Sequence, residues 1–234
     1  MQAVILAGGK GSRLLPYTMT IPKPLVPVGD VPILEVVLRQ LKHYGFTEVV
    51  LAVNHMADII MAVFGDGRKL GLQIRYSIED RVLGTAGPLS IIDGLESEFL
   101  VMNGDLLTTL DYGKVLRTHA STGSTITIAG YEKQVRVDLG VLEADGGRFR
   151  NYIEKPTYSY LVSTGIYGMS RSVVDLIPRE TKFDLPELVT KADASGATVT
   201  VFRDDYYWLD IGRAEDYERA NEIFTERRAE FIPG

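Results

Sequence analysis

A glycine-rich loop follows the first apolar run of the chain and carries the residue types best suited to binding phosphate. The run Ala3–Leu6 leads directly into Ala7-Gly8-Gly9-Lys10-Gly11-Ser12-Arg13. Glycines let backbone N–H groups approach anion oxygens without an intervening side chain. Arg13 can bridge two oxygens with its planar fork, and Lys23, between two prolines, adds a point charge. The loop is predicted to bind an anion, since a purely structural turn needs neither cation.

The spacing within this loop excludes two common phosphate-binding motifs. A P-loop places Lys-Ser or Lys-Thr after its second glycine, but here Lys10 precedes Gly11. A dinucleotide fingerprint needs a third glycine where this chain has Leu14, and Pro16 and Pro22 interrupt the helix that should follow. A dehydrogenase is therefore disfavoured.

Two aspartates have the chemistry of metal ligands. Asp105 follows the apolar run Phe99–Met102, and Asp210 lies between Trp208 and Gly212. Magnesium takes oxygen ligands, commonly one or two carboxylates together with substrate phosphates. From the local sequence alone, however, Asp105 could instead be a turn residue, and Asp210 could cap the start of a helix. Metal binding and a structural role therefore both stay open for each aspartate.

The elements that must position these residues alternate between strand and helix. Short apolar runs predict buried strands at Ala3–Leu6, Val49–Val53, Phe99–Met102 and Thr125–Ala129. Helical spacing is found at Ile33–Tyr44, His55–Phe64 and Asp111–Ala120. This alternation predicts an α/β fold of three layers, with a mixed, mostly parallel central sheet between two helical layers.

The later part of the chain adds a hairpin and a closing helix. Residues Val135–Leu142 alternate, the turn Asp145-Gly146-Gly147 follows, and Phe149–Ile153 returns, which predicts an inserted β-hairpin. A final helix is predicted from Arg213 to Ala229. With no linker or repeat apparent, residues 1–234 are expected to form one domain.

Composition narrows the function classes. Lys and Arg number 25 and Asp and Glu 31, a net charge of −6 that argues against a nucleic-acid surface. Cysteine is absent, which removes disulfides and thiolate metal sites. Neither a basic leader nor a membrane span is apparent, so a cytoplasmic protein without a membrane partner is expected. The three histidines, His43, His55 and His119, have no metal-site spacing and are interpreted as structural.

Seven short motifs in order resemble the signature of the sugar-1-phosphate nucleotidyltransferases, a family that includes the mannose-1-phosphate guanylyltransferases. The matches extend over nearly the whole chain, and it is their order that makes them specific. They are the loop with Pro22-Lys23-Pro24-Leu25, Leu83-Gly84-Thr85-Ala86-Gly87-Pro88, Asn103-Gly104-Asp105, Asp138-Leu139-Gly140-Val141, Glu154-Lys155-Pro156, Gly165-Ile166-Tyr167 and Trp208-Leu209-Asp210-Ile211-Gly212. The resemblance implies a Rossmann-like nucleotidyltransferase fold.

The resemblance also implies a role for each matching residue. Nucleotide binding falls to Leu6, Ala7, Gly8, Gly9, Gly11, Ser12, Arg13, Lys23, Gly84 and Thr85. The catalytic residues would be Arg13, Lys23, Asp105, Lys155 and Asp210, with Mg²⁺ on Asp105 and Asp210. The sugar would contact Asn103, Gly140, Glu154, Lys155, Ser163 and Thr164.

Two departures from the family pattern concern the sugar side and the C-terminus. Guanylyltransferases usually have asparagine two residues before the glycine of the Gly-Ile-Tyr motif, whereas this chain has the shorter Ser163, which leaves the sugar open. Many relatives continue into a left-handed β-helix, which is not expected in a chain that stops at Gly234.

The implied reaction joins a nucleoside triphosphate to a sugar 1-phosphate and releases pyrophosphate. The motif Leu83–Pro88 favours GTP with mannose 1-phosphate or a related hexose or heptose 1-phosphate, with uridylyl, cytidylyl or thymidylyl transfer as alternatives. A non-catalytic nucleotide-sugar sensor could lose Arg13, Lys23 or an aspartate, but all are present. A glycosyltransferase would show an Asp-x-Asp pair, whereas two leucines follow Asp105. The pathway, regulation and oligomeric state, a homo-oligomer included, stay open.

Overall fold

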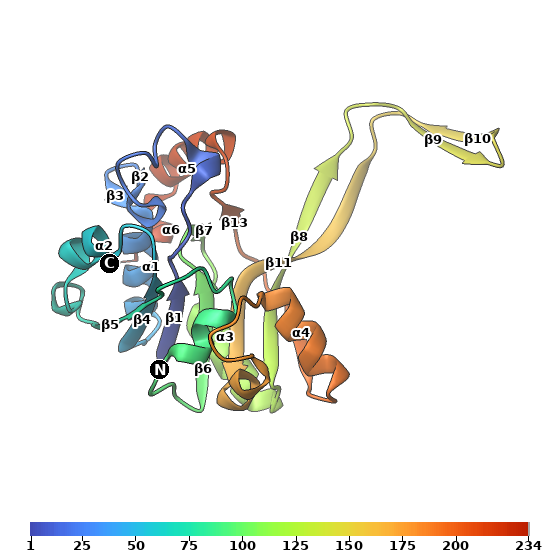
Figure 1. The fold of residues 1–234 in the computed structure, drawn as a ribbon. Helices are drawn as coiled ribbons and strands as arrows, with labels where there is room; N and C mark the ends of the chain where they lie inside the picture. The colour runs from blue at the N-terminus through green and yellow to red at the C-terminus, as the bar shows by residue number, and fades with distance from the viewer. Residues whose placement is uncertain (234) are drawn as a thin grey trace.

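The computed structural model describes residues 1–233 and is built on a seven-stranded sheet (Figure 1). From edge to edge the strands are β12 (Val199–Phe202), β8 (Ile126–Arg136), β11 (Thr157–Ser170), β6 (Glu98–Asn103), β1 (Gln2–Leu6), β4 (Glu48–Val53) and β5 (Gln73–Ile78). Only β11 runs antiparallel to its neighbours β8 and β6; the other pairs are parallel. The mixed, mostly parallel sheet predicted from the sequence is thus confirmed.

Helices cover both faces of the sheet. On one face lie α1 (Ile33–His43), α2 (Ala57–Phe64) and α3 (Tyr112–Thr122), whose Leu38, Ile60 and Val115 pack with Ile5 of β1. On the other lie α4 (Leu185–Ala194) and the 3₁₀ helices Gly87–Ile91 and Arg171–Leu176. The three-layer prediction is confirmed. Within residues 1–233, no helix is long and apolar enough to cross a membrane.

A smaller layer forms beside the carboxyl ends of the parallel strands. It contains α5 (Ala214–Glu226), α6 (Arg228–Phe231) and the strand pairs β2 (Pro27–Val28) with β3 (Val31–Pro32) and β7 (Leu106–Thr108) with β13 (Trp208–Asp210). The closing helix predicted from about Arg213 to Ala229 is confirmed as α5, but it ends earlier, at Glu226, and α6 follows as a separate turn. The break at Arg227 lets Phe231 pack against Tyr207 and Phe224, with ring centroids 5.8 and 6.1 Å apart.

The predicted hairpin is part of a long ribbon that leaves the sheet (Figure 1). Beyond the sheet, β8 and β11 stay paired as far as Arg136 opposite Thr157, and the tip is formed by β9 (Val141–Asp145) and β10 (Arg148–Ile153). The single strand predicted at Val135–Leu142 is wrong. The ladder stops because Pro156 has no N–H to donate, although its carbonyl still accepts from Val137 at 2.9 Å. We call residues 131–162 the arm.

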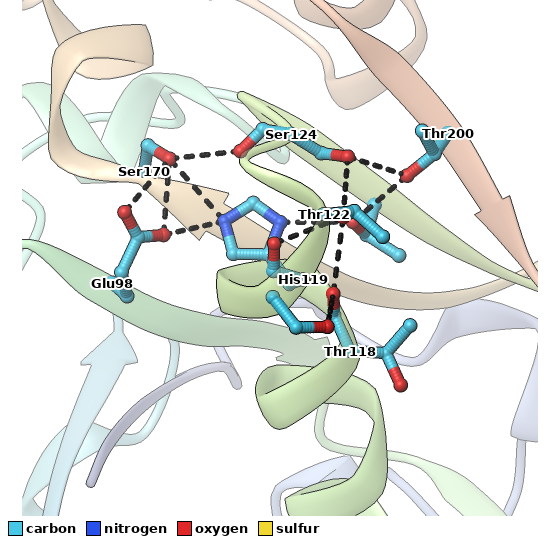
Figure 2. A network of polar contacts seen from close by, with 9 residues as sticks. Glu98, Thr118, His119, Thr122, Ser124, Ser170 and Thr200 are labelled. Atoms are coloured by element: carbon cyan, nitrogen blue, oxygen red, sulfur yellow. Dashed lines mark hydrogen bonds and ion pairs between the residues drawn. The ribbon is translucent and has the colours of Figure 1, made fainter.

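A buried polar network around His119 ties α3 to the sheet (Figure 2). Its Nδ1 lies 2.9 Å from the hydroxyl of Thr127 on β8, and its Nε2 lies 2.6 Å from a carboxylate oxygen of Glu98 at the start of β6. The Ser170 hydroxyl donates to Glu98 at 3.0 Å. Burial lowers the pKa of His119, and the neighbouring Glu98 opposes that shift only in part. These contacts agree with a structural role for this histidine.

Candidate active site

The glycine-rich loop lines a cleft of about 420 Å³ at the carboxyl end of β1. Gly11 has φ +64°, and a Cβ there would lie 2.8 Å from the Thr18 side chain, so this position requires glycine. Thr18 closes the turn by donating its hydroxyl to the Gly11 carbonyl at 2.8 Å. At Gly9 a Cβ would meet nothing within 4 Å, so the loop faces open space in the cleft.

Every residue predicted to bind the nucleotide lines this one cleft. Those residues are Leu6, Ala7, Gly8, Gly9, Gly11, Ser12, Arg13, Lys23, Gly84 and Thr85. Asn103 and Asp105 line it as well. Segments far apart in the sequence therefore meet at the edge where an open α/β sheet offers its binding crevice. Their individual roles stay predictions.

The wall of the cleft opposite the loop is a turn at Gly84 and Thr85, which is held by α4. Gly84 has φ +80°, and a Cβ there would lie 2.6 Å from the backbone of Phe183. The Thr85 N–H donates to the Asp184 carboxylate at 2.9 Å, and the Thr85 hydroxyl accepts from the Leu185 N–H at 2.8 Å. The turn is fixed to the start of α4 by these hydrogen bonds and presents only small groups to the cleft, which suits the approach of a flat base.

Asp105 and Asp210 are brought together by a short strand pair. Asp105 directly precedes β7, and β13 pairs antiparallel with β7 so that Asp210 lies opposite Leu106. Lys23 forms an ion pair with Asp105. Burial raises the pKa of the Asp210 carboxyl, the nearby Asp105 raises it further, and Lys23 and Arg13 oppose the shift. A partly buried carboxylate whose charge is further disfavoured by a neighbouring carboxylate is a candidate for binding a cation.

Glu79, which the sequence analysis did not single out, is buried in the same cleft. It directly follows β5, and its carboxylate accepts from the Leu83 N–H at 3.1 Å. Its backbone carbonyl accepts from the Asn54 side chain at 2.7 Å. Burial raises the pKa of Glu79, and the hydrogen bond from Leu83 offsets this only in part. Apart from this one N–H, the carboxylate is available to donors from a ligand.

Arg75 and Ser77 interrupt the apolar run of β5, so the strand that would have pointed to Glu79 was missed.

Three of the residues predicted to contact the sugar lie together at the inner end of the arm. Asn103 ends β6, and a Cβ on Gly165 would lie 2.6 Å from its side-chain nitrogen. The buried Thr164 donates its hydroxyl to the Ala129 carbonyl at 2.9 Å. Ser163 lies 2.9 Å from the Tyr167 hydroxyl, oxygen to oxygen. This cluster adjoins the cleft through Asn103.

The other three, Gly140, Glu154 and Lys155, belong to the arm, which leaves the sheet (Figure 1), and none of them lines the cleft. A Cβ at Gly140 would overlap the Tyr152 hydroxyl, so the position of Tyr152 requires glycine here. Lys155 has φ +44°, a conformation that costs energy for a residue with a side chain and is often kept at functional sites. Both Glu154 and Lys155 are exposed.

A second, polar hollow of about 670 Å³ adjoins the cleft and is lined by Asp210. Arg13 and Gly212 line both spaces. The hollow also contains aromatic and basic side chains, namely Tyr131, Lys133, Tyr207, Trp208, Arg213 and Arg219. Four carboxylates line it as well, those of Glu132, Asp210, Glu215 and Asp216. Its cations could pair with a phosphate and its carboxylates could accept from hydroxyl groups, so the hollow offers room for a phosphorylated, hydroxyl-rich second ligand.

An anion cradle, a carboxylate pair and a second polar hollow at one edge of an α/β sheet form a candidate site for a nucleotide and a second ligand. The chain belongs to the nucleotidyl transferase family, whose model, described as "Nucleotidyl transferase", matches residues 2–227. This agrees with the family resemblance drawn from the seven motifs.

Three similar proteins illustrate the range of the family. A UTP–glucose-1-phosphate uridylyltransferase of Synechocystis sp. is 35% identical over 94% of this chain and 62% of its own length. A probable mannose-1-phosphate guanylyltransferase of Oryza sativa subsp. japonica is 32% identical over 93% of this chain and 63% of its own length. The crystal structure of HddC from Yersinia pseudotuberculosis complexed with GMP-PN superposes with a TM-score of 0.69 at 28% identity, covering 95% of this chain and 99% of that one. The chain thus spans a little over three fifths of these two curated relatives.

Proposed function

We propose that this protein transfers a nucleotidyl group from a nucleoside triphosphate to a sugar 1-phosphate. The observation that carries the proposal is the meeting of the loop, Arg13, Lys23 and Asp105 in one cleft, with Asp210 in the adjoining hollow that shares Arg13 with it. The names of the similar proteins, which include uridylyl and guanylyl transferases acting on sugar 1-phosphates, support the same reaction. A sensor without turnover would have no need to keep all four charged side chains converged.

In the proposed step, an oxygen of the sugar 1-phosphate forms a bond to the α-phosphorus while the bond from that phosphorus to the bridging oxygen breaks. The bridging electron pair leaves with pyrophosphate. No general base is needed, because a phosphate monoester is already anionic at neutral pH. Catalysis then rests on positioning and charge neutralisation.

The charged side chains divide this work. Loop N–H groups and Arg13 hold the triphosphate and stabilise the leaving pyrophosphate. Lys23 lies beside Asp105 and would neutralise the phosphate that is attacked. Lys155 would neutralise the sugar phosphate, and Asn103, Gly140, Glu154, Ser163 and Thr164 would contact the sugar.

Asp105 and Asp210 fit a divalent cation, for which we propose magnesium. The fit rests on the donor set, since Asp105 adds to the cost of charging the partly buried Asp210 and hard cations prefer oxygen ligands. When bound, the ion supplies further charge neutralisation at the α-phosphate. No group of three or more metal-binding side chains occurs in residues 1–233, so substrate and solvent oxygens would complete the shell.

For the substrate pair we propose GTP with mannose 1-phosphate or a related hexose or heptose 1-phosphate. Guanine presents two adjacent donors, its ring N–H and its exocyclic amino group, and the buried Glu79 carboxylate can accept from both. The solved relative complexed with GMP-PN agrees with a guanine nucleotide. Uracil and thymine offer a single N–H between two carbonyls, which fits an isolated carboxylate less well.

The decisive experiment is a matrix of nucleoside triphosphates against sugar 1-phosphates. Pyrophosphate release and product mass are measured with and without magnesium. We expect metal-dependent release of pyrophosphate with formation of an NDP-sugar, highest with GTP. Nucleotide binding with no turnover across the whole matrix would instead identify a sensor.

A further inference from the structure

The arm holds Glu154 and Lys155 beyond the reach of the cleft of their own chain. From Gly130 opposite Ser163 to Arg136 opposite Thr157, β8 and β11 are paired without a register shift. At about 3.3 Å per residue, Thr157 lies about 20 Å beyond Ser163, and Lys155 follows two residues farther out. No side chain spans that distance. A site that uses these residues is therefore incomplete within one copy.

The direction of the arm is held at its base, which argues against bending back onto the same chain. Tyr131 packs against Tyr206 and Trp208, with ring centroids 5.8 and 5.6 Å apart. Lys133 places its ammonium 5.9 Å from the centre of the Trp208 ring. Trp208 in turn donates its indole N–H to the Thr164 carbonyl at 3.0 Å. Folding the arm back would give up these contacts.

The arm also exposes an apolar surface that an isolated ribbon cannot bury. Its large exposed side chains are Val135, Leu139, Leu142, Phe149, Tyr152, Tyr160 and Leu161. Leu139 is 75% exposed and Phe149 63%. A two-stranded ribbon is marginally stable alone, and apolar side chains gathered on one exposed element mark an interaction surface.

A matching apolar rim borders the cleft. Leu15, Tyr17 and Met19, in the segment after Arg13, are all exposed, and so is Val82, which lines the cleft itself. Charge does not oppose the same match. The arm has five basic and five acidic residues, so the net charge of −6 belongs to the rest of the chain. A neutral arm can approach an acidic body without added repulsion.

We propose that the partner covering the cleft is the arm of a second copy of this chain, which delivers Glu154 and Lys155 in trans. This inference rests on the proposed function, which assigns these two residues to the sugar phosphate. Reciprocal exchange of arms gives a two-fold dimer in which each copy completes the other's site. Each arm buries its apolar side chains against the partner's rim, and each dimer has two complete sites.

Complementation between two inactive variants tests the exchange. Asp105→Ala inactivates a body and leaves its arm intact, whereas Lys155→Ala inactivates an arm and leaves its body intact. The two chains are co-expressed with different affinity tags, and the doubly tagged heterodimer is purified. One of its two sites then joins an intact body to an intact arm. We expect about half of the wild-type turnover per dimer, against almost none for either homodimer.

The single variants separate failure of this inference from failure of the proposed function. If both homodimers are inactive and the heterodimer is inactive too, delivery in trans is overturned while the proposed function stands. If Lys155→Ala keeps full activity, both delivery by the arm and the role of Lys155 are overturned. Failure to recover any heterodimer also overturns the exchange.

A second variant tests the apolar contact directly. Leu139→Asp combined with Phe149→Asp should give a monomer by light scattering, with turnover lost and nucleotide binding retained. Val63→Asp is the matched control, because Val63 is 49% exposed on α2 and distant from the arm; it should stay dimeric and active. A monomeric double variant, or a monomeric wild type, with full turnover would overturn the proposal.

Discussion

Asp105 and Asp210 meet because the Ile211 N–H donates to the Asp105 carbonyl at 3.1 Å while Asp210 pairs with Leu106. The backbone, rather than the side chains, thus brings the carboxylates together. Removing either carboxyl leaves this pairing intact. The effect of such a change on activity is therefore separable from an effect on folding.

Asp105→Ala and Asp210→Ala are each expected to reduce magnesium-dependent pyrophosphate release by at least about 10²-fold, because each removes half of the proposed metal site. Thermal unfolding should change little. Asp204→Ala is the control, since Asp204 pairs with Lys114 on the surface and should leave activity unchanged. Full activity in either cleft variant would refute the metal assignment.

Gly11→Ala should destabilise the loop, whereas Gly9→Ala should not. Alanine at position 11 must adopt φ +64° and place its Cβ against Thr18, which we expect to cost about 1–2 kcal/mol in unfolding free energy. At Gly9 the new methyl meets no protein atom within 4 Å. Denaturant unfolding of both variants provides the comparison, and the KM for the nucleotide shows any steric effect of the Gly9 variant. Equal stability of the two variants would show that the loop does not require glycine at position 11.

Most of the central sheet was predictable from the sequence because its parallel strands are buried on both faces. Ala3, Val4 and Ile5 have no exposed surface, and uninterrupted apolar runs of this kind are easily recognised. By contrast β5 was missed, since it contains Arg75 and Ser77, and β11 was missed because its outer half is exposed. The length of the arm could not be foreseen, as the pairing of β8 with β11 depends on contacts between distant segments.

The nucleotide side of the site was predictable for a different reason. Its glycines lie in one short loop, and the backbone conformation that they need is a local property. The position of Asp210 depends on β13 pairing with β7, which no local pattern announces; only the resemblance joined it to Asp105. Glu79 carried no signal beyond its place after a strand that was itself missed.

Glu79→Gln is expected to change base selectivity. A glutamine amide offers one acceptor and one donor, which matches the N–H and carbonyl edge of uracil or thymine better than the two donors of guanine. We predict that kcat/KM for GTP falls by about 10- to 100-fold, as expected for loss of about 1–3 kcal/mol of base discrimination. UTP and dTTP should lose less or gain. Asp80→Asn, a change at the exposed neighbouring residue, serves as the control. An equal fall for all nucleotides would show that Glu79 only supports the fold.

His119 should make the protein less stable as the pH falls. Burial lowers its pKa in the folded state below the value of about 6.5 expected when the chain is unfolded. Below that pH the unfolded chain takes up a proton that the folded protein excludes, so the free energy of unfolding decreases until the folded-state pKa is passed. His119→Gln removes this titration and should flatten the pH dependence of the free energy of unfolding between pH 7 and 5. The same change breaks the hydrogen bonds to Glu98 and Thr127, which should lower the free energy of unfolding at pH 7 by about 1–3 kcal/mol. Urea unfolding across this range provides the measurement. The control is His43→Gln, a change at an exposed residue, which should follow the wild type. If the free energy of unfolding of His119→Gln keeps the wild-type slope against pH, other groups cause the pH dependence.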